Sequence, residues 1–159
     1  MNYSFKKKGK FNYVEIGKGR PIIILHGLMG GLSNFTGVTE FFNENGYKVV
    51  LPELPLYSLP LLSTNVKTFA EYLKEFIDFL GFDEVILLGN SLGGHIGLLY
   101  TKLYPTKVKA LVITGSSGLY ESAMGSGYTK RSDYEVMKAK VQEVFYDPEV
   151  ASKEMIDEV

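Results

Sequence analysis

Residues 85–96 of this chain read Val-Ile-Leu-Leu-Gly-Asn-Ser-Leu-Gly-Gly-His-Ile. The unbroken apolar run from Val85 to Leu88 predicts a strand that is buried on both faces. After Ser91, apolar residues recur at the helical period up to Pro105, which predicts a helix. The Gly-x-Ser-x-Gly pattern between the two therefore predicts a sharp turn from a strand into a helix, with Ser91 at its tip.

A serine at such a turn is well placed for chemistry. The backbone there is strained, at a cost of about 1–3 kcal/mol for a residue other than glycine, and Gly89 and Gly93 keep a Cβ from crowding the strand and the helix. The Ser91 hydroxyl stands above the end of the sheet at a helix N-terminus, where free N–H groups favour developing negative charge. Gly-x-Ser-x-Gly between a strand and a helix is typical of a catalytic nucleophile, so we predict that Ser91 is one.

Other interpretations of a glycine-rich turn fit less well. A dinucleotide-binding turn needs Gly-x-Gly-x-x-Gly, and Ser91 stands where the second glycine belongs. The Gly-x-x-x-x-Gly-Lys pattern of a phosphate-binding loop does not occur. The pattern is short enough to arise by chance, so its interpretation depends on the strand before it and the helix after it.

A second glycine-rich segment follows another apolar strand. Residues 21–25 read Pro-Ile-Ile-Ile-Leu, and residues 26–31 read His-Gly-Leu-Met-Gly-Gly. A strand that ends in His-Gly and a glycine-rich loop resembles the oxyanion-hole loop of the alpha/beta-hydrolases. In that family one backbone N–H of the oxyanion hole comes from this loop and another from the residue after the nucleophile. The resemblance implies that the two donors are Leu28 and Leu92 here.

The same resemblance implies roles for the neighbouring residues. His26 and Gly27 would shape the loop, and Gly89 and Gly93 would shape the turn, without reacting themselves. The other histidine of the chain, His95, follows the serine by four residues, about one helical turn, and its side chain is expected to point into the fold. A serine hydroxyl is a poor nucleophile without an adjacent base, and neither histidine is expected to supply that base.

Composition limits the class of protein. The 159 residues suit one domain, and an apolar content of 45% with 11 Tyr and 10 Phe can fill a core. A net charge of −1 with scattered cations argues against binding nucleic acid, and the run Lys6–Lys8 is expected to solvate a turn. The chain has no cysteine for disulfides or thiolate metal sites, and a serine mechanism needs neither a metal nor a cofactor. No signal peptide or membrane-spanning run is recognised, so a soluble cytoplasmic protein without membrane contact is expected.

Apolar strands alternate with amphipathic helices along most of the chain. Strands are expected at 10–16, 21–25, 49–51, 85–88 and 110–113, the first of them as a half-exposed edge strand. Helices are expected at 34–45, 66–80 and 91–104. This alternation predicts an α/β fold with a mostly parallel, doubly wound sheet.

The alternation stops after Ile113. Residues 119–130 are rich in Gly, Ser and Tyr, and two further helices are expected at about 132–145 and 148–159. Residues 11–118 resemble the N-terminal part of an alpha/beta-hydrolase, and residues 119–159 resemble the start of the helical lid over its active site. We therefore expect a core domain at 1–118 and a partial lid at 119–159.

Part of the family's catalytic machinery is not found in this sequence. The family order is nucleophile, acid, then histidine, and the last two lie beyond the lid. The sequence stops at Val159 in a helical pattern, with no histidine after His95. The resemblance therefore predicts a C-terminally incomplete sheet in a truncated piece of a longer hydrolase that lacks the acid and the histidine. The strand at 110–113 would leave an unpaired edge, through which the chain would self-associate.

Functions from different classes remain open. The first is a serine hydrolase that acts on an ester, or on a related acyl or carbon–carbon bond of a small apolar substrate, through Ser91. Its Gly-Asn-Ser-Leu-Gly-Gly motif is similar to that of esterases and carbon–carbon bond hydrolases. The second is a non-catalytic hydrolase-like domain that binds a small apolar ligand or a partner chain. The third is an interaction module that works through its edge strand.

Overall fold

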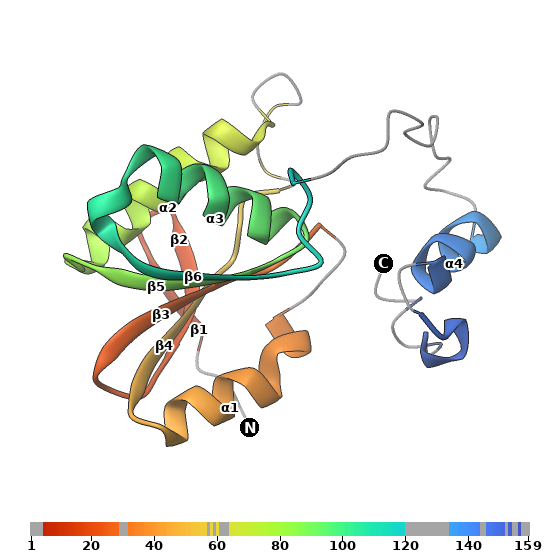
Figure 1. Ribbon diagram of the computed structural model, residues 1–159, viewed down its shortest axis with the longest axis horizontal. Helices are drawn as coiled ribbons and strands as arrows, with labels where there is room; N and C mark the ends of the chain where they lie inside the picture. The colour runs from red at the N-terminus through yellow and green to blue at the C-terminus, as the bar shows by residue number, and fades with distance from the viewer. Residues whose placement is uncertain are drawn as a thin grey trace. The chain divides into compact units, whose positions relative to one another are not determined.

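A computed structural model describes most of the chain (Figure 1). The described residues are 5–28, 32–56, 58, 60, 64–119, 134–143, 146–151, 153 and 156. The chain forms two compact units, Met1–Tyr120 and Glu121–Val159, and each is described by itself.

The first unit is built on one six-stranded sheet in the order β1-β2-β4-β3-β5-β6. The strands are β1 (Phe5–Lys8), β2 (Phe11–Ile16), β3 (Arg20–Leu25), β4 (Tyr47–Pro52), β5 (Val85–Asn90) and β6 (Val108–Thr114). β2 pairs antiparallel with both β1 and β4, whereas β4, β3, β5 and β6 are mutually parallel. The mostly parallel α/β sheet expected from the sequence is therefore confirmed.

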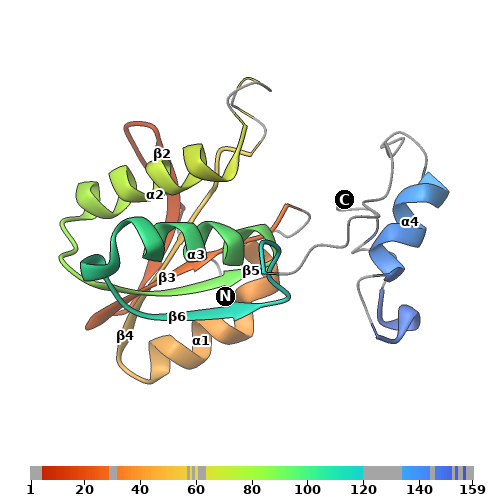
Figure 2. The ribbon, with the colours of Figure 1, turned by 45° about the horizontal axis from the view of Figure 1, so that its top comes forward.

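Helices cover both faces of this sheet (Figure 2). The short 3-10 helix η1 (Leu32–Phe35) and α1 (Thr36–Glu44) lie on one face, and α2 (Val66–Leu80) and α3 (Leu92–Leu103) lie on the other. The apolar core is accordingly split by the sheet into two clusters. Successive residues of β3 show the split, since Ile23 packs in the cluster with α2 and Ile24 in the cluster with α1.

The bounds of α2 follow from its sequence. Asn65 caps the N-terminus, where its side chain accepts a hydrogen bond of 3.0 Å from the Thr68 N–H. Gly81 ends the helix in the left-handed conformation, with φ of 71°. Between these ends Leu73 and Phe76 are fully buried at the helical spacing, so the helix expected at 66–80 is confirmed.

The N-terminal edge of the sheet differs from the expectation. The strand expected at 10–16 as an edge is an inner strand, because β1 pairs with it on the outside. The lysine run Lys6–Lys8 lies in β1, and not in a turn. Charged side chains are tolerated there because an edge strand faces solvent, where lysines also discourage pairing with other chains.

β6 is the last strand of the described sheet, and its two faces differ in burial. Leu111 packs toward α3, where its side chain meets Gly97: a Cβ added at Gly97 would come within 2.9 Å of it. The opposite face is more open, and Val112 is 45% exposed. Among the described residues, only β5 pairs with β6.

The second unit contains α4 (Tyr134–Glu143) and the 3-10 turn η4 (Pro148–Val150). A small apolar cluster of Val141, Ala151 and Ile156 holds it together. One continuous helix over 148–159 is wrong, because η4 is a single turn and Ala151 after it has ψ of 90°. Residues 120–133 lie outside the described part. No helix in the described ranges is long and apolar enough to cross a membrane.

Candidate active site

Ser91 has the unusual backbone conformation that the sequence pattern predicts. Its φ is 53° and its ψ is −120°, and among the described residues no other non-glycine residue has a positive φ. It precedes α3 as the N-cap residue, yet its side chain makes no capping hydrogen bond. The strained turn therefore leaves the hydroxyl free of the role that an N-cap serine normally has.

Backbone hydrogen bonds hold this turn against the end of β6. The Ser91 N–H donates to the Thr114 carbonyl at 3.0 Å, and the Ser91 carbonyl accepts the N–H groups of Gly94 and His95 at 3.1 and 3.2 Å. The Asn90 side-chain amide donates to the Thr114 carbonyl at 3.1 Å and to its hydroxyl oxygen at 3.0 Å. The position of Ser91 is thus set by β5, β6 and α3 together.

Gly89 and Gly93 are needed because backbone passes close to both. A Cβ at Gly89 would lie 2.6 Å from the nitrogen of Gly94. A Cβ at Gly93 would lie 2.6 Å from the carbonyl carbon of Leu25 and 2.8 Å from the oxygen of His26. Backbone atoms cannot move aside as a flexible side chain can, so larger residues would push α3 away from the sheet.

The loop after β3 lies directly beside Ser91. A Cβ added at Gly27 would be 3.0 Å from the Ser91 Cβ, a tight contact that would require Ser91 to shift by a few tenths of an ångström. Leu28 follows and is 40% exposed, while residues 29–31 lie outside the described part. Leu92 is the first residue of α3. The structure thus brings the His-Gly loop and the serine turn together at the same end of the parallel strands.

His26 is engaged on both ring nitrogens. The Leu54 N–H donates to Nε2 at 3.0 Å, and Nδ1 lies 2.9 Å from the Gly27 carbonyl oxygen. The side chain is buried. Burial lowers the pKa of His26, although the hydrogen bond to Gly27 and the charge of Glu53 oppose that shift. His26 therefore binds the loop after β3 to the loop after β4, as a neutral imidazole.

His95 contacts the segment after β6. Its Nδ1 lies 3.4 Å from the Ser117 hydroxyl oxygen, and a Cβ added at Gly118 would lie 2.6 Å from its ring. Within the described residues, neither imidazole ring forms a hydrogen bond with the Ser91 hydroxyl: the ring of His26 contacts Gly27 and Leu54, and the ring of His95 contacts Ser117. No base for the serine is therefore present in the described arrangement.

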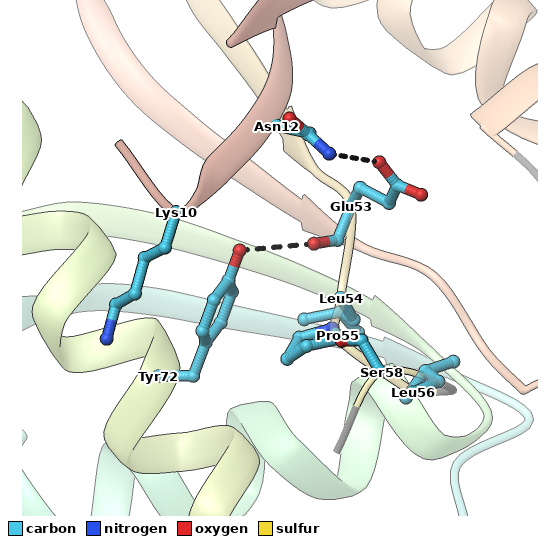
Figure 3. Close-up of a pocket in the computed structure, with 8 residues that line it drawn as sticks. All are labelled: Lys10, Asn12, Glu53, Leu54, Pro55, Leu56, Ser58 and Tyr72. Carbon is cyan, nitrogen blue, oxygen red and sulfur yellow. Dashed lines mark hydrogen bonds between the residues drawn. The ribbon is translucent and has the colours of Figure 1, made fainter. Parts of the chain in front are cut away.

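A pocket of about 330 Å³ is lined in part by the segment that follows β4 (Figure 3). Ser91 is not among the residues that line it, which are Lys10, Asn12, Glu53, Leu54, Pro55, Leu56, Ser58 and Tyr72. Tyr72 of α2 lines it and donates a hydrogen bond of 3.2 Å to the Glu53 carbonyl. Sequence reasoning missed Leu54 and Tyr72, because their bonds join segments that are distant in the chain and no motif marks them.

Comparison with known proteins identifies the class that this fold and turn define. The sequence profile of the alpha/beta hydrolase fold matches residues 20–156, and the chain belongs to this family of hydrolase enzymes. The resemblance seen in the two glycine-rich segments is thereby confirmed.

Two curated hydrolases are similar in sequence to two thirds or more of this chain. A 2-hydroxy-6-oxo-6-phenylhexa-2,4-dienoate hydrolase of Comamonas testosteroni is 27% identical over 91% of this chain and 57% of its own length. A 2-hydroxy-6-oxononadienedioate/2-hydroxy-6-oxononatrienedioate hydrolase of Paraburkholderia phymatum is 32% identical over 67% of this chain and 40% of its own length. The chain thus spans about half, or less, of the length of these curated relatives.

A solved structure is more similar still. The alpha/beta hydrolase enzyme MGS-MChE2, from the metagenome of lagoon sediments at Mar Chica, Morocco, is 69% identical, with a TM-score of 0.71. The match covers 74% of this chain and 54% of that one. An epoxide hydrolase of Vigna radiata is 25% identical over 70% of this chain and 37% of its own, with a TM-score of 0.63.

Proposed function

We propose that the complete gene product containing this chain is a serine hydrolase with Ser91 as its nucleophile. The observation that carries the proposal is the conformation of Ser91, with a positive φ and a side chain unused by its own helix. Strain of this kind costs about 1–3 kcal/mol and persists where function requires it.

The reaction follows from these positions. The Ser91 oxygen attacks a substrate carbonyl carbon and forms a bond to it, while the hydroxyl proton passes to a base. The N–H groups of Leu28 and Leu92 stabilise the negative charge on the carbonyl oxygen, and each such donor is worth about 2.7–4 kcal/mol in comparable enzymes. The leaving group departs with the proton, and water then releases the acid and restores the serine.

The base and its acid partner are proposed to come from further residues of a longer polypeptide. Within the described part, neither imidazole meets Ser91, and the related hydrolases are about twice as long as the matched region. We also propose that residues 119–159 are the start of a helical lid. The enzyme would be cytoplasmic.

The substrate is proposed to be a small carbonyl compound, either an ester or a compound cleaved at a carbon–carbon bond. The names of the curated relatives support this class, because each names a 6-oxo dienoate or dienedioate as the compound hydrolysed. A 6-oxo carbonyl is an electrophile that a serine nucleophile can attack.

Turnover of model substrates tests the proposal. The complete gene product should hydrolyse p-nitrophenyl acetate or a 2-hydroxy-6-oxo-dienoate, and Ser91→Ala should lower kcat by about 10⁴-fold or more. Ser58→Ala is the matched control, because Ser58 is exposed and lies on another loop. Equal activity of Ser91→Ala and the unmodified enzyme would contradict the assignment.

A non-catalytic function is favoured by one observation: within the described residues, neither imidazole ring forms a hydrogen bond with the Ser91 hydroxyl. Such a protein would hold a small apolar ligand without turning it over. Ligand binding that survives Ser91→Ala, with no hydrolysis by either protein, would support this alternative.

A further inference from the structure

A chain of hydrogen bonds begins at α2 and runs through a single peptide group after β4. The Tyr72 hydroxyl donates to the Glu53 carbonyl at 3.2 Å (Figure 3). The same peptide group carries the Leu54 N–H, which donates to His26 Nε2 at 3.0 Å. A hydrogen bond accepted at a peptide oxygen makes the N–H of that peptide a stronger donor.

The chain continues through His26. Since Nε2 accepts a hydrogen bond, the proton of the neutral imidazole resides on Nδ1. Nδ1–H therefore donates to the Gly27 carbonyl oxygen, 2.9 Å away. The lowered pKa of His26, caused mainly by burial, keeps the ring in this neutral form.

The chain of hydrogen bonds ends at the peptide group between Gly27 and Leu28. The Gly27 carbonyl and the Leu28 N–H belong to one peptide, just as the Glu53 carbonyl and the Leu54 N–H do. We propose that Tyr72 is a positioning residue, which aligns and polarises the Leu28 N–H toward the substrate oxygen through Leu54, His26 and Gly27. The inference rests on the proposed function, in which the Leu28 N–H stabilises the oxyanion.

We call this chain of hydrogen bonds, from Tyr72 to the Leu28 N–H, the relay. Hydrogen bonds between Glu53 and Asn12 support its first member. The Glu53 N–H donates to the Asn12 carbonyl at 2.8 Å, and the Asn12 side chain donates to a Glu53 carboxylate oxygen at 3.0 Å. These bonds tie Glu53 to β2, one residue before the peptide group that Tyr72 contacts. Leu54 and His26 are buried, 4% and 8% exposed, so water does not compete for their bonds and the local dielectric is low.

Tyr72 remains a hydrogen-bond donor at any pH at which the enzyme would work. Burial, and to a smaller extent the charge of Glu53, raises the pKa of Tyr72 to about 12. The phenol therefore stays protonated, and its single proton is directed at the Glu53 carbonyl.

Removal of one hydroxyl tests the relay. Tyr72→Phe in the complete gene product should lower kcat by less than about twofold, because a strengthening of about 10–30% per bond is passed on through the bonds of His26 before it reaches the oxyanion donor. KM should stay unchanged, because the donor acts mainly on charge that develops in the transition state. An unchanged kcat, or a change in KM alone, would overturn the proposal.

Tyr100→Phe is the matched control. Tyr100 lies in α3, is fully buried, and its hydroxyl has no hydrogen-bond partner among the described residues. The same chemical change there should leave kcat and KM as they are. Equal losses in Tyr72→Phe and Tyr100→Phe would show a general packing effect and would contradict the relay.

A spectroscopic measurement tests the relay without catalysis. Tyr72→Phe should shift the Nδ1–H signal of His26 and the amide signal of Leu28 upfield in nitrogen-15 NMR spectra, and Tyr100→Phe should not. If the unmodified enzyme failed to hydrolyse any substrate, the proposed function would fall, and these shifts would still decide the relay. Unmoved signals in an active enzyme would overturn the relay alone.

Discussion

Ser91 stores backbone strain at the point where chemistry is proposed. With φ of 53° and ψ of −120°, it lies in a region that glycine reaches without steric cost. Ser91→Gly should therefore be more stable than Ser91→Ala by about 1–2 kcal/mol in the free energy of unfolding, measured with urea. If Ser91→Gly and Ser91→Ala had the same free energy of unfolding, the backbone at Ser91 would not be strained. The main support for Ser91 as a nucleophile would then be lost.

His26 links stability to pH. The unfolded imidazole takes up a proton near its ordinary pKa of 6.5, whereas burial lowers the pKa in the folded protein. The contribution of His26 to the free energy of unfolding is therefore fully present above pH 6.5. It is lost as the pH falls from 6.5 toward the lowered pKa of His26 in the folded protein. Between about pH 7.5 and about pH 5.5 the unmodified protein should lose more unfolding free energy than His26→Asn does. A larger loss in the variant would contradict the buried, neutral imidazole.

At the scale of elements, the contact between α3 and the end of β3 depends on Gly93. A Cβ there would meet the backbone of Leu25 and His26, so Gly93→Ala should destabilise the fold by about 3 kcal/mol. Gly37 is the control, since it lies in α1 with nothing within 4 Å of an added Cβ. Gly37→Ala should stabilise by about 0.5–1 kcal/mol. Thermal unfolding of both variants checks this, and equal destabilisation would contradict the close contact.

The elements that periodicity specifies were predictable from the sequence. The helix Val66–Leu80 is marked by its apolar spacing and by Gly81, and the buried strands β3 and β5 by unbroken apolar runs. β1 was missed because Lys6–Lys8 dominates it, and charge hides the strand signal at an edge.

The turn at Ser91 was predictable because its geometry demands glycines at fixed spacing. The bonds of Tyr72 and Leu54 to other segments were not, since they join residues 19 and 28 positions apart. Only the folded structure determines which peptide group faces which side chain, and no local pattern reports it.

At the scale of the whole molecule, the outer edge of β6 has no neighbouring strand in the described sheet and is open to pairing. Val112 is 45% exposed on a strand that has one neighbour in the described sheet. We predict that the 159-residue chain self-associates through this edge, and that Val112→Lys reduces the apparent mass toward the 17.8 kDa of one chain. Val150→Lys is the control, because Val150 is also exposed but lies in η4. Light scattering that shows a monomer of the unmodified chain would contradict the prediction.

Covalent labelling with a serine-directed reagent shows whether Ser91 is a nucleophile. The purified complete gene product would be treated with a fluorophosphonate, digested, and its peptides examined by mass spectrometry. We expect one modified residue, Ser91, and a loss of hydrolysis in proportion to the labelling. A folded, hydrolytically active protein that carries the label on another serine, or carries none, would contradict it.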